Sequence, residues 1–285
     1  MKLRHTAACV GLVTAALVTT SACGAEGAKT AAKAVDGADK VMAALARATD
    51  RTENLGSAKV RMSTDLGAPT GPIAMDGTYS WGDGFAFDVE MDTKAAQMQS
   101  LTSSPKVRTL FVGGAYYYDI DPQPSGPLKG KEWMKIDGSA VFGEKGGQAM
   151  AGGTGGGSPV ASMKALKYAS DVDDLGKETV DGQSTTHYHA VVKANQMGKL
   201  KDVYGDQSSM LNQMTGANGS LVMDVWVNGK DLPVRMKEVI GSATITLDFE
   251  KFGGTATIKP PPAAQTGDLT ETLKKLRQQQ QQQQG

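Results

Sequence analysis

The chain has 285 residues and balanced charge, with 30 Lys and Arg against 30 Asp and Glu. Without a basic patch or an acidic tail, this balance argues against a nucleic-acid partner. The chain has two cysteines, and no apolar run after the first is long enough to cross a membrane. These features indicate one large β-rich domain that needs no disulfide.

The first 22 residues have the layout of an export signal. A short basic start precedes an uncharged, mostly apolar stretch, and small residues then lead into Cys23, with Thr20 where an aliphatic residue is usual. A cysteine in this place is typical of a bacterial lipoprotein signal. We therefore expect removal of residues 1–22 and acylation of Cys23, which would hold the protein on the membrane. The alternative is a secreted protein that is cleaved near Ala22 or Ala25.

The mature chain is then expected on the outer face of the cytoplasmic membrane. The mature chain is then expected to have no free thiol, because Cys9 is removed with the signal and Cys23 carries the lipid. Cysteine catalysis and cysteine metal sites are thereby excluded. Residues 23–35 are rich in Ala, Gly, Lys and Thr and predict a flexible tether.

Downstream, the apolar pattern predicts an α+β protein. Val41, Leu45 and Ala48 recur at helical spacing and predict a helix over 36–53. The period then changes to two, which is typical of half-buried antiparallel strands. The expected strands cover 58–66, 73–81, 85–91, 107–112, 116–120, 133–136, 175–180, 185–193, 221–227, 234–240, 243–249 and 255–258.

Other segments interrupt or follow this strand pattern. Helices are expected over 139–150, 158–168 and 195–214, with a flexible loop at 152–157. The domain is expected to span 36–262. Residues 263–285 are expected to form a short helix and a disordered glutamine-rich tail.

Three segments carry a resemblance to a known family. They are the strand-turn-strand Glu178–His189, the hairpin Val225–Arg235, and the closing Phe249–Gly253 that precedes a Lys-Pro-Pro. With the lipoprotein signal and the first helix, the chain resembles the LppX/LprA/LprF/LprG lipoproteins, which are related in fold to the LolA and LolB carriers. The resemblance implies a strongly curved antiparallel sheet, a half-barrel, with helices across its concave face. It also implies a cavity for the acyl chains of lipids or lipoglycans.

A cavity of this kind needs apolar lining and a movable cover. Methionine suits surfaces that accept varied apolar partners, although ordinary core filling explains many methionines equally well. The candidate lining residues are Ile73, Met75, Tyr79, Phe85, Phe87, Val89, Tyr116 and Met223. The candidate lid residues are Met98, Leu101, Met210, Leu211 and Met214.

Catalytic and metal chemistry have little support in the sequence. His187 and His189 point to one side of a strand, but no third ligand is evident, so we expect no metal site. Residues 152–157 lack the Lys and Ser or Thr of a phosphate loop, and we expect no cofactor. Three hypotheses remain: a lipid-binding or lipid-carrying lipoprotein, an envelope interaction or sensor module, and, least favoured, an envelope enzyme.

Overall fold

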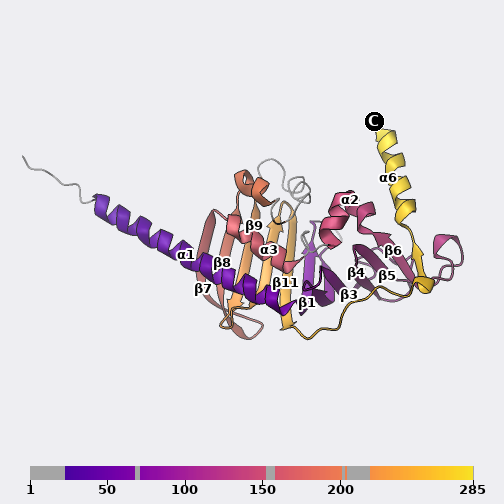
Figure 1. Ribbon diagram of the computed structural model, residues 1–285, viewed down its shortest axis with the longest axis horizontal. Coiled ribbons are helices and arrows are strands. Elements are labelled where there is room, and N and C mark those ends of the chain that lie inside the picture. Colours follow the sequence, from indigo (N-terminus) through magenta and orange to yellow (C-terminus); the bar gives the residue numbers. More distant parts are fainter. Residues whose placement is uncertain (1–22, 68–70, 152–157, 201–202, 204–218, 285) are drawn as a thin grey trace, which may run out of the picture. The chain divides into compact units, whose positions relative to one another are not determined.

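The computed structural model describes residues 23–67, 71–151, 158–200, 203 and 219–284 (Figure 1). The chain divides into two units, Met1–Asp36 and Gly37–Gly285. The described part of the first unit is helical, and the second unit holds the β-sheet.

The described elements alternate between strands and short helices. The strands are β1 (Ser57–Asp65), β2 (Ile73–Ser80), β3 (Ala86–Asp92), β4 (Lys106–Val112), β5 (Ala115–Asp119), β6 (Trp133–Asp137), β7 (Asp171–Val180), β8 (Gln183–Val192), β9 (Leu221–Asn228), β10 (Pro233–Ile240), β11 (Ala243–Phe252) and β12 (Thr266–Asp268). The α-helices are α1 (Cys23–Leu55), α2 (Gly138–Ala151), α3 (Pro159–Ala165) and α6 (Thr270–Gln284). The 3-10 helices are η1 (Gly126–Leu128), η2 (Leu166–Tyr168), η3 (Ala194–Leu200) and η5 (Ala263–Gln265).

The twelve strands form one open, curved sheet in the order β12-β6-β5-β4-β3-β2-β1-β11-β10-β9-β8-β7. Neighbouring strands are antiparallel, except that β12 runs parallel to β6. The first strand lies in the middle of the sheet and pairs with β11, so strands from both ends of the chain meet there. The predicted α+β class and the curved antiparallel sheet are confirmed.

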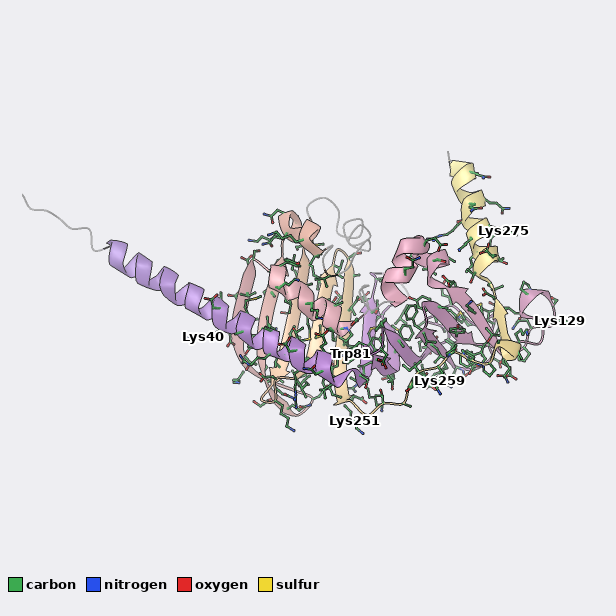
Figure 2. The ribbon with its side chains drawn as sticks, in the orientation of Figure 1. Lys40, Trp81, Lys129, Lys251, Lys259 and Lys275 are labelled. Atoms are coloured by element: carbon green, nitrogen blue, oxygen red, sulfur yellow. The ribbon has the colours of Figure 1, made fainter. Side chains whose placement is uncertain are left out.

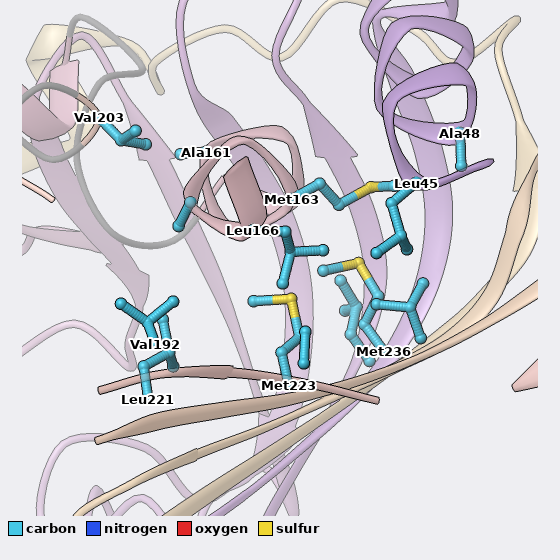
Figure 3. Packing of buried hydrophobic residues seen from close by; sticks show 14 of the residues in the cluster. Leu45, Ala48, Ala161, Met163, Leu166, Val192, Val203, Leu221, Met223 and Met236 are labelled. Carbon is cyan, nitrogen blue, oxygen red and sulfur yellow. The ribbon is translucent and has the colours of Figure 1, made fainter. Parts of the chain in front are cut away.

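The sheet has two chemically different faces. Residues that pair across neighbouring strands point to the same side, so the register assigns each side chain to a face. We call the concave face that carries Val60, Met223 and Met236 the inner face, and the opposite one the outer face. Leu45 of α1 and Met163 of α3 belong to the same buried cluster as these three residues (Figure 3). The two helices therefore cover part of the inner face, as predicted.

The outer face carries charged residues in pairs. Arg61 contacts Asp181 and Glu250 at 3.3 Å each, and the guanidinium of Arg108 binds the Asp88 carboxylate at 2.7 Å. Exposed pairs of this kind contribute little individually. Their place on alternate residues of β1, β3 and β4 keeps one side of each strand polar and leaves the other for the core.

Three segments differ from the sequence-based expectation. Residues 23–35, expected as a tether, are helical, because α1 begins at Cys23; alanine is the best helix former and recurs there. Helix α6 continues through the glutamines to Gln284, since glutamine also favours helix. No strand forms at 255–258. Gly253 and Gly254 have positive φ values of 68° and 66° and turn the chain out of the sheet just before that segment.

The end of α1 is fixed to the sheet by specific contacts. The indole nitrogen of Trp81 donates to the carbonyl of Thr52 at 2.9 Å (Figure 2). The Trp81 amide donates to the carbonyl of Gly56 at 2.8 Å, directly after the helix. The Lys164 amine of α3 reaches the Glu53 carboxylate at 2.5 Å. These contacts set where both helices lie over the inner face.

Gly77 provides a test of how closely β2 and β3 pack. A Cβ atom at Gly77 would lie 2.1 Å from the carbonyl oxygen of Asp88 and 2.7 Å from the Cα of Val89. We expect Gly77→Ala to lower the free energy of unfolding by about 1–3 kcal/mol, measured by urea denaturation. The matched control is Gly37→Ala in α1, where a Cβ meets no atom within 4 Å. This control should be neutral or stabilising by up to about 1 kcal/mol. Equal effects of the two substitutions would contradict the packing argument.

Candidate functional site

A row of aligned apolar side chains crosses the inner face. From one end to the other it comprises Met236, Leu247, Met62, Met75, Met91 and Val107, on β10, β11, β1, β2, β3 and β4. Each member is the direct register partner of the next, so all six point to the inner face. We call this set the methionine row, because four of its six side chains are methionines.

The middle of the methionine row is accessible. Met236, Leu247 and Val107 are buried, whereas Met62, Met75 and Met91 are partly exposed. Adjacent strands lie about 4.8 Å apart, so the row spans roughly 24 Å. One leaflet of a bilayer has acyl chains about 15 Å long, since the hydrocarbon core is about 30 Å thick. The accessible part, on three adjacent strands, spans roughly 10 Å and can therefore contact about two thirds of an acyl chain lying across the strands.

A cluster of aromatic rings lies beside the methionine row. Tyr79 stacks on Phe87, whose ring in turn stacks on Phe111, with centroid distances of 5.5 and 5.7 Å. Tyr116 contacts Phe111 at 4.8 Å, and Phe85 contacts Tyr79 at 5.6 Å. Offset and edge contacts of this kind add to the stability gained from burial. The cluster forms a rigid end to the inner face.

The phenol groups in this cluster remain uncharged. Burial raises the pKa of Tyr79 and of Tyr116 well above the ordinary tyrosine value. The Tyr79 hydroxyl donates a hydrogen bond to the sulfur of Met62 at 3.2 Å, which satisfies a polar group in an apolar setting and orients the thioether. The surface near Met62 therefore presents neutral, polarizable groups.

A separate polar cluster lies on the outer face, across β7, β8 and β9. His187 contacts Glu178 through Nδ1 at 2.8 Å and Asp224 through Nε2 at 3.0 Å. His189 contacts the same Asp224 oxygen at 2.8 Å, and Trp226 stacks on His187 with a centroid distance of 4.1 Å.

This outer cluster supplies the acidic neighbours that the sequence did not reveal. Glu178 lies on the neighbouring strand β7, where it pairs with Thr185, two residues from His187. Asp224 pairs with His189 across β8 and β9. Among the described residues, no group of three or more His, Cys, Asp or Glu side chains is arranged to hold a metal ion. The two histidines instead join β7, β8 and β9 through hydrogen bonds to Glu178 and Asp224.

Two curated proteins are similar to this chain in sequence. One is an uncharacterized 31.2 kDa protein of Streptomyces griseus, 27% identical over 246 residues, which cover 82% of this chain and 80% of that protein. The other is named as a candidate lipoprotein of Streptomyces coelicolor, 27% identical over 247 residues, which cover 81% of this chain and 75% of that protein. No protein-family model matches the sequence.

Two solved structures are similar to this chain in fold. The lipoprotein LppX of Mycobacterium tuberculosis has a TM-score of 0.51 and 17% identity, with coverage of 78% of this chain and 99% of LppX. LprF of Mycobacterium bovis has a TM-score of 0.50 and 12% identity, with coverage of 79% and 98%. The chain has the LppX/LprF fold. The resemblance seen in the sequence is thereby confirmed at the level of architecture.

The LppX/LprF fold distributes the eight predicted lining residues over two environments. Tyr79, Phe85, Val89 and Met223 are fully buried in the main core. Met75, Phe87 and Tyr116 are partly exposed and pack against that core, and Ile73 is also partly exposed. The first four contribute chiefly to stability. The other four remain candidates for contact with a ligand, which shifts the candidate surface toward the methionine row.

The predicted lid residues also fall into two groups. Met98 and Leu101 pack against a small second cluster of Ile120, Leu128 and Met134. The carbonyl of Leu101 accepts a hydrogen bond from the Asp121 amide at 2.9 Å, which holds the 93–102 turn to that cluster. Met210, Leu211 and Met214 lie outside the described residues. No helix in the described part of the chain is both long and apolar enough to span a membrane.

Several residues of the site were not predicted. Phe111 is fully buried and links Phe87 to Tyr116, although its alternation with Val107 and Thr109 already placed it on the inner side of β4. The alignment of Met62 with Met75 depends on pairing between strands. Sequence periodicity assigns a side chain to a face but does not give its cross-strand partner.

The contacts in the outer cluster predict a lowered pKa for the Glu178 carboxyl group. The hydrogen bond from the Trp226 indole lowers the pKa of Glu178 below its ordinary value, and the hydrogen bond from His187 lowers it further. This stabilising effect is present above the unfolded-state pKa and is lost as the pH falls through the folded-state pKa. We expect Trp226→Phe to raise the Glu178 pKa, measured by NMR titration of its carboxyl carbon. The control is Trp133→Phe, which leaves Glu178 untouched. An unchanged Glu178 pKa in Trp226→Phe would refute this assignment.

Proposed function

We propose that this protein is an exported, membrane-anchored lipoprotein that binds the acyl chains of a lipid or lipoglycan against its inner face. It would carry or hold that lipid at the cell envelope, on the outer side of the cytoplasmic membrane. The observation that carries the proposal is the partial exposure of Met62, Met75 and Met91, aligned across three strands on the inner face.

Two further observations support this proposal. The chain has the fold of LppX, a lipoprotein, and one of its relatives is named as a candidate lipoprotein. An exposed row of flexible thioethers suits an apolar partner of variable shape, because methionine adapts its rotamers at low cost. The neighbouring aromatic cluster supplies a fixed wall against which such a chain can lie.

The driving force is removal of methylene groups from water. Each buried methylene contributes about 0.8 kcal/mol, so about ten of them contribute roughly 8 kcal/mol before the cost of association. Burial of an acyl chain therefore needs no covalent chemistry to reach useful affinity. A role without catalysis follows from this mechanism, and an envelope protein partner would receive or deliver the lipid.

A charge placed in the methionine row tests the lipid-binding proposal. We expect Met75→Asp to reduce acyl-lipid binding at least tenfold, because a carboxylate in the row must lose its hydration when a chain lies on it. Binding is measured by native mass spectrometry of the full chain carrying Cys23→Ser after incubation with phospholipid vesicles. The matched control is Ala74→Asp, the preceding residue on the outer side of β2, where exposure makes the substitution harmless.

The outcomes separate the two main hypotheses. Binding that is lost in Met75→Asp and kept in Ala74→Asp supports a lipid site on the inner face. Consistent absence of lipid from the protein without either substitution, with no transfer of lipid between vesicles, would contradict the proposal. That result would favour an envelope interaction or sensor module whose inner face is filled by its own side chains.

Membrane anchorage through Cys23 is tested independently. We expect the unsubstituted protein to partition with membranes and to carry a mass increase on Cys23, because two or more acyl chains anchor a protein stably. Cys23→Ser should move the protein to the soluble fraction, as judged by fractionation and intact-mass measurement. Membrane partition that survives Cys23→Ser would exclude Cys23 as the anchor.

A further inference from the structure

Glu238 is an exception on the inner face. Strands β9, β10, β11 and β1 to β6 present apolar, glycine or hydroxyl side chains on that face, and among their described residues Glu238 is the single carboxylate or cationic group there. The flanking charged residue Lys237 points to the outer face, as alternation requires. A carboxyl group that is partly removed from water on such a face is costly unless a polar neighbour offsets the loss of hydration.

The register places Glu238 beside the methionine row. Glu238 pairs with Met223 on β9 and with Ile245 on β11, and the same line of partners continues through Thr64 to Ile73. This line lies two residues along the strands from the methionine row, a distance of about 7 Å. It runs parallel to the row on the same face.

On β10, β11 and β1 the inner face becomes more accessible toward this line, and Glu238 and Thr64 make it more polar, whereas Met223 on β9 is fully buried. On the other side of the methionine row, Val60 and Val89 are 1% exposed and Phe249 is 4% exposed. Beyond the row, Glu238, Thr64 and Ile73 are all partly exposed. A molecule lying on the methionine row therefore meets a dry apolar surface at one side and oxygen-bearing groups at the other. This is the gradient that an amphiphile requires.

The Glu238 carboxyl group is held in place from above. Ser162 of α3, which is itself buried, hydrogen-bonds to it through its side chain. Burial raises the pKa of Glu238, and the hydrogen bond from Ser162 opposes that rise only in part. A carboxyl group with a raised pKa spends more of its time protonated, and a protonated carboxyl both donates and accepts hydrogen bonds.

We propose that Glu238 forms a polar subsite on the inner face and selects uncharged acyl lipids that carry a free hydroxyl over lipids with an anionic headgroup. This inference rests on the proposed function, and it adds the headgroup class to it. Glu238 lies two strands from Met62, the nearest accessible methionine, and two residues further along, which is roughly 12 Å. A hydroxyl at that distance from the acyl chain on the accessible methionines reaches the carboxyl and bonds to it. A phosphate in the same place must give up hydration of its charge, and no described cation on this part of the inner face offsets that cost.

Two lipids that differ in one group provide the test. Diacylglycerol ends in a hydroxyl, and phosphatidic acid with the same acyl chains carries a phosphate there. The full chain with Cys23→Ser is incubated with phosphatidylcholine vesicles that contain equal amounts of both, and native mass spectrometry gives the ratio bound. We expect a ratio of at least ten in favour of diacylglycerol. A single hydrogen bond to a charged or strongly polar partner corresponds to about a tenfold preference.

Substitutions at Glu238 then change the ratio in different directions. Glu238→Leu should lower it about tenfold while total lipid uptake is kept or increased, because only the polar contact is lost. Glu238→Gln should keep most of the preference, since an amide also donates and accepts. Glu238→Lys should reverse the preference toward phosphatidic acid. The control is Glu90→Leu, which removes an exposed outer-face acid that lies 3.7 Å from Lys106 and should leave the ratio unchanged.

The outcomes separate this inference from the proposed function. The subsite would be overturned if the ratio of bound diacylglycerol to phosphatidic acid were the same in the unsubstituted protein, in Glu238→Leu and in Glu238→Lys. Lipid binding would then stand, and Glu238 would act only to hold α3 through Ser162. Uptake of neither lipid by the unsubstituted protein would overturn the proposed function and the subsite together. Circular dichroism checks folding, and if Glu238→Lys does not fold, Glu238→Leu and Glu238→Gln decide the question.

Discussion

The pairing of β1 with β11 is the constraint on which the candidate site depends. It joins strands from the two ends of the chain, and its register sets Met62 opposite Leu247. Met236 reaches the methionine row through Leu247, and Met75 reaches it through Met62. A slip of one residue in this single ladder would turn one half of the row to the outer face. The accessible apolar surface is thus a property of long-range pairing rather than of any one segment.

Coverage of the inner face is uneven, and this unevenness has a physical origin. A sheet with one apolar face must bury it, and α1 and α3 do so where Leu45, Met163 and Leu166 meet β9 and β10. In a second area of the inner face, the rings of the aromatic cluster pack against one another. Between the two lies the stretch occupied by Met62, Met75 and Met91, where apolar area remains partly accessible. The candidate site is therefore a part of the inner face that the described residues cover only partly.

The sequence predicted the strands better than it predicted their partners. Alternation placed Val60, Met62 and Thr64 on one side of β1, but nothing local indicates that β1 pairs with β11. Residues 23–35 were expected to be flexible because they lack apolar periodicity, whereas helix propensity alone makes them helical. Glu238 lies two residues from both Met236 and Ile240 on β10, so its place on the inner face follows from alternation alone. Its hydrogen bond to Ser162 depends on how α3 packs.

In the proposed lipid-binding role, the composition of the inner face divides recognition into a rigid part and an adaptable part. Phe87, Phe111 and Tyr116 restrain one another through ring contacts, so their surface changes little when a ligand arrives. The three accessible methionines have flexible side chains and fit chains of different length or branching. Such a surface discriminates poorly among acyl chains, because each methylene adds a similar free energy wherever it lies. Selectivity must then come from a polar group in a fixed position. Among the described inner-face residues of the nine central strands, Glu238 beside Ser162 of α3 is the carboxyl group so placed.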